Sequence, residues 1–208
     1  MKTNYKMTVT ALASIALGAM MVAGIATASP QETVRVRGAV ERIDGSIYVI
    51  RARDGAESKV MLADNPQIAG VVKASLSDIE QGSFVGVTAM PQADGSQIAL
   101  EVHIFPESMR GTGEGHYPWD LRPQSTMTNA TVGQVVTAVD GQTLTLKYKD
   151  GEKKISVPAN TPIVAYVPGD KSDIKLGAKV FIVAIKQPDG TLQGRAWRVG
   201  RDGVTPPM

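Results

Sequence analysis

Two short stretches of the chain decide its fold: VERIDGSIYV at residues 40–49 and VTAVDGQTLT at residues 136–145. In each stretch an Asp-Gly pair separates two runs rich in β-branched residues. This is a strong signal for a β-hairpin, because aspartate and glycine both accept a positive φ. After the second pair, Leu144, Leu146 and Tyr148 alternate with polar residues, which is typical of a strand with one buried face. Both stretches therefore predict β-hairpins.

The two stretches belong to an internal repeat. Residues 43–45 correspond to 139–141 and residues 53–55 to 149–151, each pair 96 positions apart. Further landmarks are 95 positions apart, and these are Ser77 with Ser172, Ile79 with Ile174, Gly82 with Gly177, Val85 with Val180 and Gly95 with Gly190. Landmarks that recur in the same order, with one deletion between them, indicate duplication.

Each half predicts the same series of elements. After the first hairpin come a third strand (59–62 or 154–157), a helical turn (75–81 or 171–176), a fourth strand (83–89 or 178–185) and a fifth strand (96–104 or 191–199). A helix between the third and fourth of five strands is the order of the OB-fold, although other small barrels share parts of it. We therefore predict an all-β protein of two tandem OB-like five-stranded β-barrel units with short helical turns, joined by an irregular segment. Units of this size have small cores, so the two barrels are expected to pack together.

The N-terminus has the pattern of a signal peptide. Lys2 and Lys6 precede the mostly apolar residues 7–25, and small residues at 26–28 offer a cleavage site. The alternative is an uncleaved anchor, because the apolar stretch approaches the length of a membrane-spanning helix. The domains expected are a signal peptide (1–28), a first unit (29–105), an irregular glycine-rich connecting segment (106–128) and a second unit (129–208). A periplasmic or secreted location follows, with no membrane span after cleavage.

Composition narrows the classes of partner. The chain has no cysteine, which excludes disulfides and lipid attachment through cysteine. Only two of its 22 basic residues and none of its 20 acidic residues lie before position 29, so the remaining chain has a formal net charge of zero. Proteins that bind single-stranded nucleic acid combine a basic groove with stacking aromatic residues, and this sequence indicates neither feature. Nucleic acid is therefore not an expected partner.

The repeat, together with the string MRGTGEGHYPWD at residues 109–120, resembles a family of exported bacterial proteins of unknown function built from OB-like repeats. The resemblance spans most of the chain after the signal peptide. It implies a periplasmic, non-membrane β protein. It brings no established activity and no catalytic residues.

The segment at 106–128, called the central segment below, has no counterpart inside either repeat. Its large aromatic residues normally bury, so it is expected to fold over the junction of the two barrels. The candidate binding residues are Arg110, Glu114, His116, Tyr117, Trp119 and Asp120. Glu114, His116 and Asp120, with His103 as the other histidine, are also possible ligands for a metal such as zinc, although the signal is weak.

No catalytic motif is recognisable. The three spaced glycines 111, 113 and 115 lack the βαβ context of a dinucleotide site, and neither histidine has the surroundings of a catalytic triad. The sequence therefore predicts a noncatalytic binding or scaffold protein of the cell envelope, without a cofactor, whose partner is an envelope protein or a small ligand. The alternatives are binding of a glycan or anion on an OB-like barrel face, or weak metal binding through the central segment.

Overall fold

The computed structural model describes residues 1–2 and 31–208, and residues 31–208 form one compact unit. The predicted signal peptide lies almost entirely outside the described residues. From residue 31 onward the chain is all-β, with three single-turn helices: η1 (Leu76–Asp78), η2 (Glu107–Met109) and η3 (Lys171–Asp173). No helix in the described part of the chain combines the length and apolar character that a membrane span requires.

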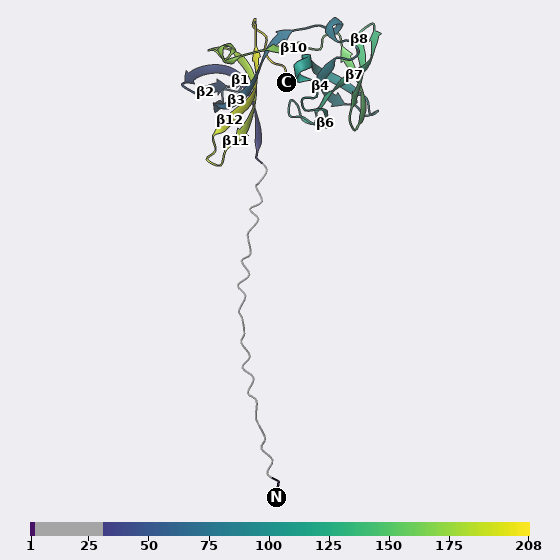
Figure 1. The fold of residues 1–208 in the computed structure, drawn as a ribbon. Helices are drawn as coiled ribbons and strands as arrows, with labels where there is room; N and C mark the ends of the chain where they lie inside the picture. Colours follow the sequence, from purple (N-terminus) through teal and green to yellow (C-terminus); the bar gives the residue numbers. More distant parts are fainter. Residues whose placement is uncertain (3–30) are drawn as a thin grey trace. The chain divides into compact units, whose positions relative to one another are not determined.

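Hydrogen-bonded pairing closes two rings of five strands (Figure 1). The first ring consists of β1 (Thr33–Asp44), β2 (Ile47–Arg51), β3 (Glu57–Lys73), β11 (Lys179–Lys186) and β12 (Leu192–Gly200), and it closes through a parallel β12–β3 pairing. The second ring consists of β4 (Phe84–Pro91), β5 (Gln97–Ile104), β7 (Thr126–Ala138), β8 (Gly141–Tyr148) and β9 (Gly151–Pro158), and it closes through a short parallel β5–β9 pairing. A short strand, β6 (Gly115–Pro118), pairs with β7.

Each ring takes strands from both halves of the sequence. The first ring has three strands from the first half and two from the second, and the second ring has the reverse. The crossovers are reciprocal, because the Gly82 N–H donates to the Val132 carbonyl and the Gly177 N–H donates to the Val40 carbonyl, both at 2.8 Å. The expected division into two tandem units is therefore not confirmed. Alternation of apolar residues sets which side of a strand is buried, and it does not set which copy supplies the neighbouring strand.

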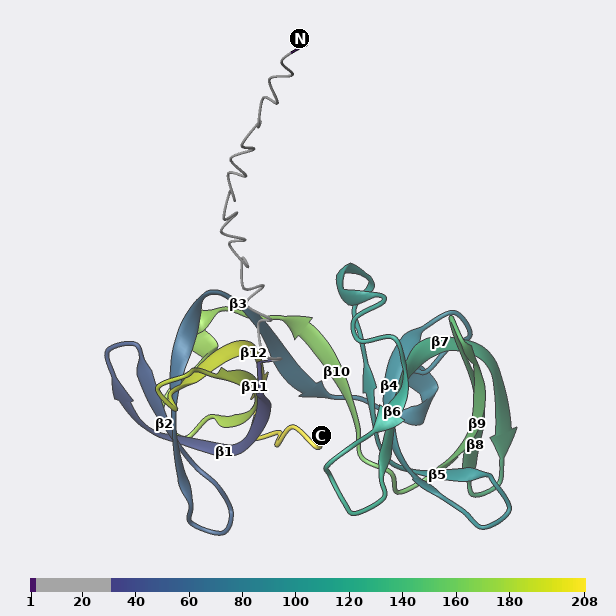
Figure 2. The ribbon, with the colours of Figure 1, turned by 90° about the horizontal axis from the view of Figure 1, so that it is seen from below.

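Two strands carry the chain from one ring to the other (Figure 2). β3 has 17 residues, far more than the third strand expected at 59–62, and its last part pairs antiparallel with β10 (Ile163–Pro168). β10 also pairs in parallel with β5 of the second ring. The crossing of β3 and β10 therefore links the rings through backbone hydrogen bonds.

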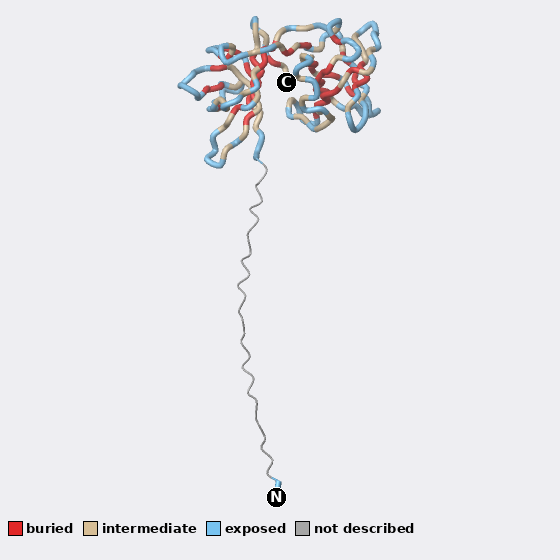
Figure 3. Tube along the Cα trace, in the orientation of Figure 1, coloured by how far each residue is buried: buried red, intermediate tan, exposed pale blue. Residues whose placement is uncertain are grey.

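Buried residues form three clusters (Figure 3). The first-ring interior includes Tyr48 and Trp197, whose ring centroids are 5.1 Å apart. The second-ring interior is aliphatic. The third cluster lies where the rings meet, which we call the junction, and it includes Phe84, Phe105, Tyr166, Phe181 and Met208. The expectation that the two barrels pack together has its physical basis in this cluster.

The Asp-Gly turns differ in one respect from the expected chemistry. Gly95 and Gly190 adopt φ values of +83° and +84°, whereas Asp94 and Asp189 before them do not have a positive φ. The carboxylate of Asp94 instead accepts the Ser96 N–H at 3.0 Å, and that of Asp189 accepts the Thr191 N–H at 2.9 Å. The aspartates thus stabilise the turns through their side chains.

Candidate binding site at the junction of the two rings

The central segment packs against the first ring through Trp119. The guanidinium carbon of Arg35, on β1, lies 4.0 Å from the centroid of the indole. Phe181, on β11, lies 6.3 Å away from the same ring, centroid to centroid. A cation above its aromatic face and an aromatic neighbour both stabilise the Trp119 side chain against the first ring. The Trp119 N–H donates to the carbonyl of Ser125, the residue directly before β7, at 2.7 Å, which holds this part of the backbone beside the second ring.

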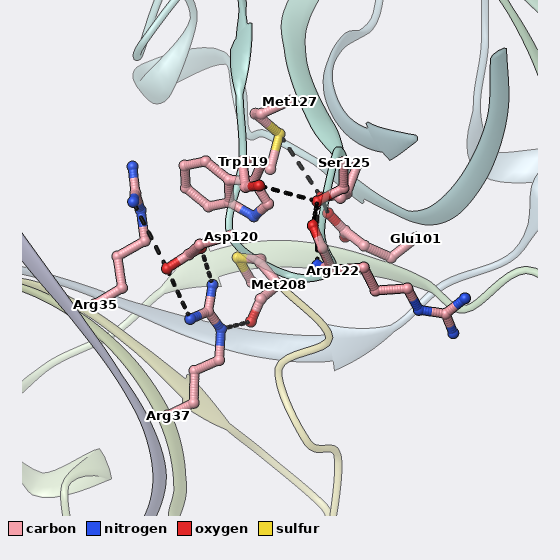
Figure 4. A network of polar contacts seen from close by, with 10 residues as sticks. Arg35, Arg37, Glu101, Trp119, Asp120, Arg122, Ser125, Met127 and Met208 are labelled. Atoms are coloured by element: carbon pink, nitrogen blue, oxygen red, sulfur yellow. Dashed lines mark hydrogen bonds and ion pairs between the residues drawn. The ribbon is translucent and has the colours of Figure 1, made fainter. Parts of the chain in front are cut away.

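Asp120 adds an ion pair to the same contact (Figure 4). The Arg37 Nη2 lies 2.7 Å from its Oδ1 and the Arg35 Nη1 lies 3.7 Å from its Oδ2. Partial burial alone would raise the pKa of Asp120, but the hydrogen bond and charge of Arg37, with the charge of Arg35, lower it below its usual value. Arg37 also donates through Nε to the carbonyl of the C-terminal Met208 at 2.7 Å. The central segment therefore contacts the first ring through Trp119 and Asp120 and the second ring through β6.

Arg110 and Glu114 hold other parts of the central segment in place. Arg110 forms an ion pair with Glu107 at 2.6 Å and donates to the Gly82 carbonyl at 3.0 Å. Glu114 accepts the backbone N–H of Lys149 at 3.1 Å. Both side chains thus have intramolecular partners.

His116 and Tyr117 point to opposite faces of β6. The His116 Nδ1 lies 2.8 Å from the Thr128 Oγ1, and burial together with the charge of Lys153 lowers the His116 pKa. The Tyr117 hydroxyl accepts from the Asn129 Nδ2 at 3.3 Å, and burial raises its pKa. Within the described residues, no group of three or more histidine and carboxylate side chains gathers as a metal site would require. Glu114, His116 and Asp120 are engaged separately, so the structure does not support the metal alternative.

A buried polar cluster on the outer face of the second ring joins His103, named above as a possible metal ligand, to Glu101 and Thr88, which the sequence analysis did not single out. Glu101 is fully buried, and its carboxylate accepts a hydrogen bond from the Thr88 hydroxyl through one oxygen. The other oxygen lies 3.2 Å from the His103 Nδ1. The side chains of Val87 and Val102, on the opposite face of the same strands, fill the ring interior. In a single barrel this polar face would contact water, but here the junction covers it.

Gly86 makes room for this cluster. It is the cross-strand neighbour of both His103 and Asn129. A Cβ at this position would lie 2.0 Å from the His103 Nε2 and 2.5 Å from the Asn129 Oδ1. The absence of a side chain therefore lets the two polar groups approach each other across β4.

Tyr166 connects this cluster to a second buried ion, Arg198. The His103 ring stacks on Tyr166 with centroids 5.0 Å apart, and the Arg198 guanidinium carbon also lies 5.0 Å from the Tyr166 centroid. Burial raises the Tyr166 pKa well above its usual range. His103 and Arg198 are 95 positions apart and thus occupy equivalent positions in the repeat. The fifth strands of both halves therefore present a cationic or titratable side chain to one tyrosine of β10.

Two cavities flank the crossing of β3 and β10. The larger, of about 480 Å³, lies between the end of β3, the start of β10 and the C-terminal tail, where Thr205 lines it. The smaller, of about 340 Å³, lies beside η2 and is lined by Arg198, and we call it the Arg198 cavity. Both are within the size range of small-molecule sites. They are the places where the junction could hold a ligand.

Sequence reasoning missed Glu101 and Arg198 for a physical reason. Glu101 and His103 alternate with Leu100 and Val102, so period two marks them as the solvent face of a strand. Arg198 follows the buried Trp197 in the same way. A signal was present, since His103 and Arg198 share a repeat position. Only the packing of the rings shows that this face is covered.

No protein-family model, curated protein or solved structure matches this chain. The resemblance to an exported family of OB-like repeats thus stays a prediction.

Proposed function

We propose that this protein is an exported, noncatalytic binding protein of the cell envelope, and that its ligand is a small molecule held at the junction of two OB-like barrels. The observation that carries the proposal is the pair of cavities beside the β3–β10 crossing. Each cavity is lined by segments from both halves of the sequence. A site of this kind exists only when both rings are assembled, which gives the duplication a functional purpose.

The order of elements supports the OB-like assignment. In the first half the order is β1, β2, β3, η1, β4 and β5, and in the second half it is β7 to β10, η3, β11 and β12. A short helix precedes the fourth barrel strand in both halves. We propose that the rings are two OB-like barrels that have exchanged their last two strands within one chain.

The geometry around His103 supports a noncatalytic role for the buried polar cluster. In a hydrolytic triad the histidine lies between the nucleophile and the carboxylate. Here Glu101 lies between Thr88 and His103, so the hydroxyl has no basic nitrogen beside it. His103 is only 3% exposed and is packed against Phe105 and Tyr166. The cluster therefore orients and stabilises the junction.

The location in the envelope rests on the N-terminal sequence, whose charged start, apolar stretch and small residues have the order of a signal peptide. The net charge of zero after residue 28 gives no reason to invoke nucleic acid or an anionic membrane surface.

The proposal is tested by capture of small molecules from an envelope extract. The purified protein is immobilised, and retained compounds are identified by mass spectrometry. Two variants obstruct the cavities at exposed lining residues, Ser108→Trp for the Arg198 cavity and Thr205→Trp for the larger one. Ser77→Trp, at an exposed position outside both linings, is the matched control.

A compound retained by the parent and by the Ser77 variant, and lost from one of the cavity variants, is the expected result. Equal retention by all variants, or no compound retained above an empty matrix, would overturn the proposal. Conversion of the compound into a product would show that the protein is an enzyme.

A further inference from the structure

The Arg198 cavity is built from four separate segments. β3 contributes Ile68, η2 contributes Met109, β10 contributes Val167 and β12 contributes Arg198. Three of these side chains are apolar and one is a cation. The polar residues Gln67, Ser108 and Thr112 also line the cavity, and Arg198 is the one charged residue of its lining.

The Arg198 guanidinium is buried without a carboxylate partner. Its side chain is 7% exposed, and its Nη1 donates to the Trp197 carbonyl at 3.2 Å and, at the limit of hydrogen bonding, to the Gln67 carbonyl at 3.5 Å. None of the ion pairs between residues 31 and 208 includes Arg198. A buried cation is costly unless an anion compensates it.

The nearby buried carboxylate does not compensate Arg198 directly. Both oxygens of Glu101 are engaged, one by Thr88 and the other by His103. Tyr166 lies in contact with both His103 and Arg198, at 5.0 Å in each case. Arg198 lines the cavity, and its hydrogen bonds to backbone carbonyls are both made by Nη1.

We propose that the Arg198 cavity binds a monocarboxylate that carries a compact apolar body. This inference rests on the proposed function and names its ligand class. The planar guanidinium fork matches a carboxylate in geometry. One cation compensates one negative charge, whereas a dianion would leave buried charge without a partner. The apolar walls contributed by Ile68, Met109 and Val167 favour a hydrocarbon body over a bare anion.

The test is isothermal titration calorimetry of the purified protein with four probes: benzoate, hexanoate, acetate and inorganic phosphate. Benzoate or hexanoate is expected to bind at least tenfold more tightly than acetate, because acetate has almost no apolar surface to bury. Phosphate is expected to bind more weakly than either. Tighter binding of phosphate, or equal affinity for all four probes, would overturn the proposal.

Variants locate the site. Arg198→Met is expected to weaken benzoate or hexanoate binding by about tenfold or more, since it removes a charge-assisted hydrogen bond. Arg195→Met, at an exposed position of the same strand, is the matched control and is expected to leave the affinity unchanged. If Arg198→Met does not fold, the affinities of Arg198→Lys and Ser108→Trp for benzoate or hexanoate are measured instead. Weaker binding in both variants supports the site, and unchanged affinity in both overturns it.

The two proposals fail in different ways. Suppose that an extract compound is retained and that its retention depends on the cavities, but no carboxylate binds and Arg198→Met has no effect. This result would overturn the ligand class and leave the binding function standing. If no compound is retained from the extract but benzoate binds measurably at Arg198, the proposed function fails and the carboxylate site stands.

Discussion

The two halves of the sequence follow the same order of elements, except that the long strand β3 of the first half corresponds to two strands, β9 and β10, in the second, and neither half contains a closed ring. Ile79 and Ile174 occupy equivalent positions, 95 residues apart, directly after the helical turns. Ile79 is buried in the second ring, among residues of β7 to β9, and Ile174 is buried in the first ring. A repeat unit in sequence is thus not a folding unit in space. The predictions below test this difference between the halves and the rings.

The largest effect is expected when the halves are separated. Residues 29–105 and residues 106–208, each produced alone, should lack cooperative unfolding, because each would expose ring interiors that the other half covers. Mixed together, the fragments should restore the fold of the parent. Circular dichroism and thermal unfolding of the separate and mixed fragments provide the measurement. A stable, cooperatively folded fragment on its own would show that the rings do not depend on exchange.

Ile79→Ala and Ile174→Ala should each lower the free energy of unfolding by about 2–4 kcal/mol, since each removes a buried aliphatic side chain. Their local effects should differ. Hydrogen exchange in Ile79→Ala should accelerate first in β7 to β9, and in Ile174→Ala first in β1 to β3. Leu176→Ala, at a side chain that is 65% exposed, is the control and should change neither quantity. Acceleration confined to the strands that precede each isoleucine in sequence would contradict the exchanged rings.

Gly86→Ala should lower the free energy of unfolding by about 1–3 kcal/mol, because its Cβ would overlap the His103 ring and the Asn129 amide. Gly133→Ala is a matched control on β7, since its Cβ would meet only the flexible side chain of Lys147. Urea denaturation of both variants gives the comparison. Equal stabilities would mean that the polar cluster can move away at little cost.

Asp120→Asn should have the smallest effect, at most about 1 kcal/mol at neutral pH, because its side chain is 45% exposed and solvent screens the ion pair. Its folded pKa lies below the usual value, so the stabilisation is present above pH ~4 and is lost as the pH falls through the folded pKa. Parent and variant should therefore differ in urea denaturation at pH 7 and converge under acid conditions. Asp64→Asn, at an exposed position of β3, is the control. A difference that grew toward low pH would contradict the assignment of this ion pair.

Much of the fold could be predicted from residues close together in the chain. Alternating residues such as Leu144 and Leu146 marked the strands. The helical turns expected at 75–81 and 171–176 are shorter in the structure, at Leu76–Asp78 and Lys171–Asp173, and Gly82 and Gly177, with φ values of +91° and +81°, lie in the turns that follow them. The aromatic residues of the central segment correctly indicated a packed position. The roles of Glu101 and Arg198 could not be predicted in the same way, because a polar residue in an alternating strand indicates solvent unless another surface covers it.

The sequence by itself determined the local structure: the hairpins, the helical turns, the duplication and the side of each strand that faces a ring interior. Backbone geometry and apolar periodicity are short-range properties, so neighbouring residues suffice to specify them. Only the tertiary structure decided which strands close each ring and which outer faces become the junction. These choices depend on contacts between residues far apart in the chain, and two similar repeats offer nearly equivalent partners for the same strand edge. The buried Arg198 and its cavity exist because of that choice.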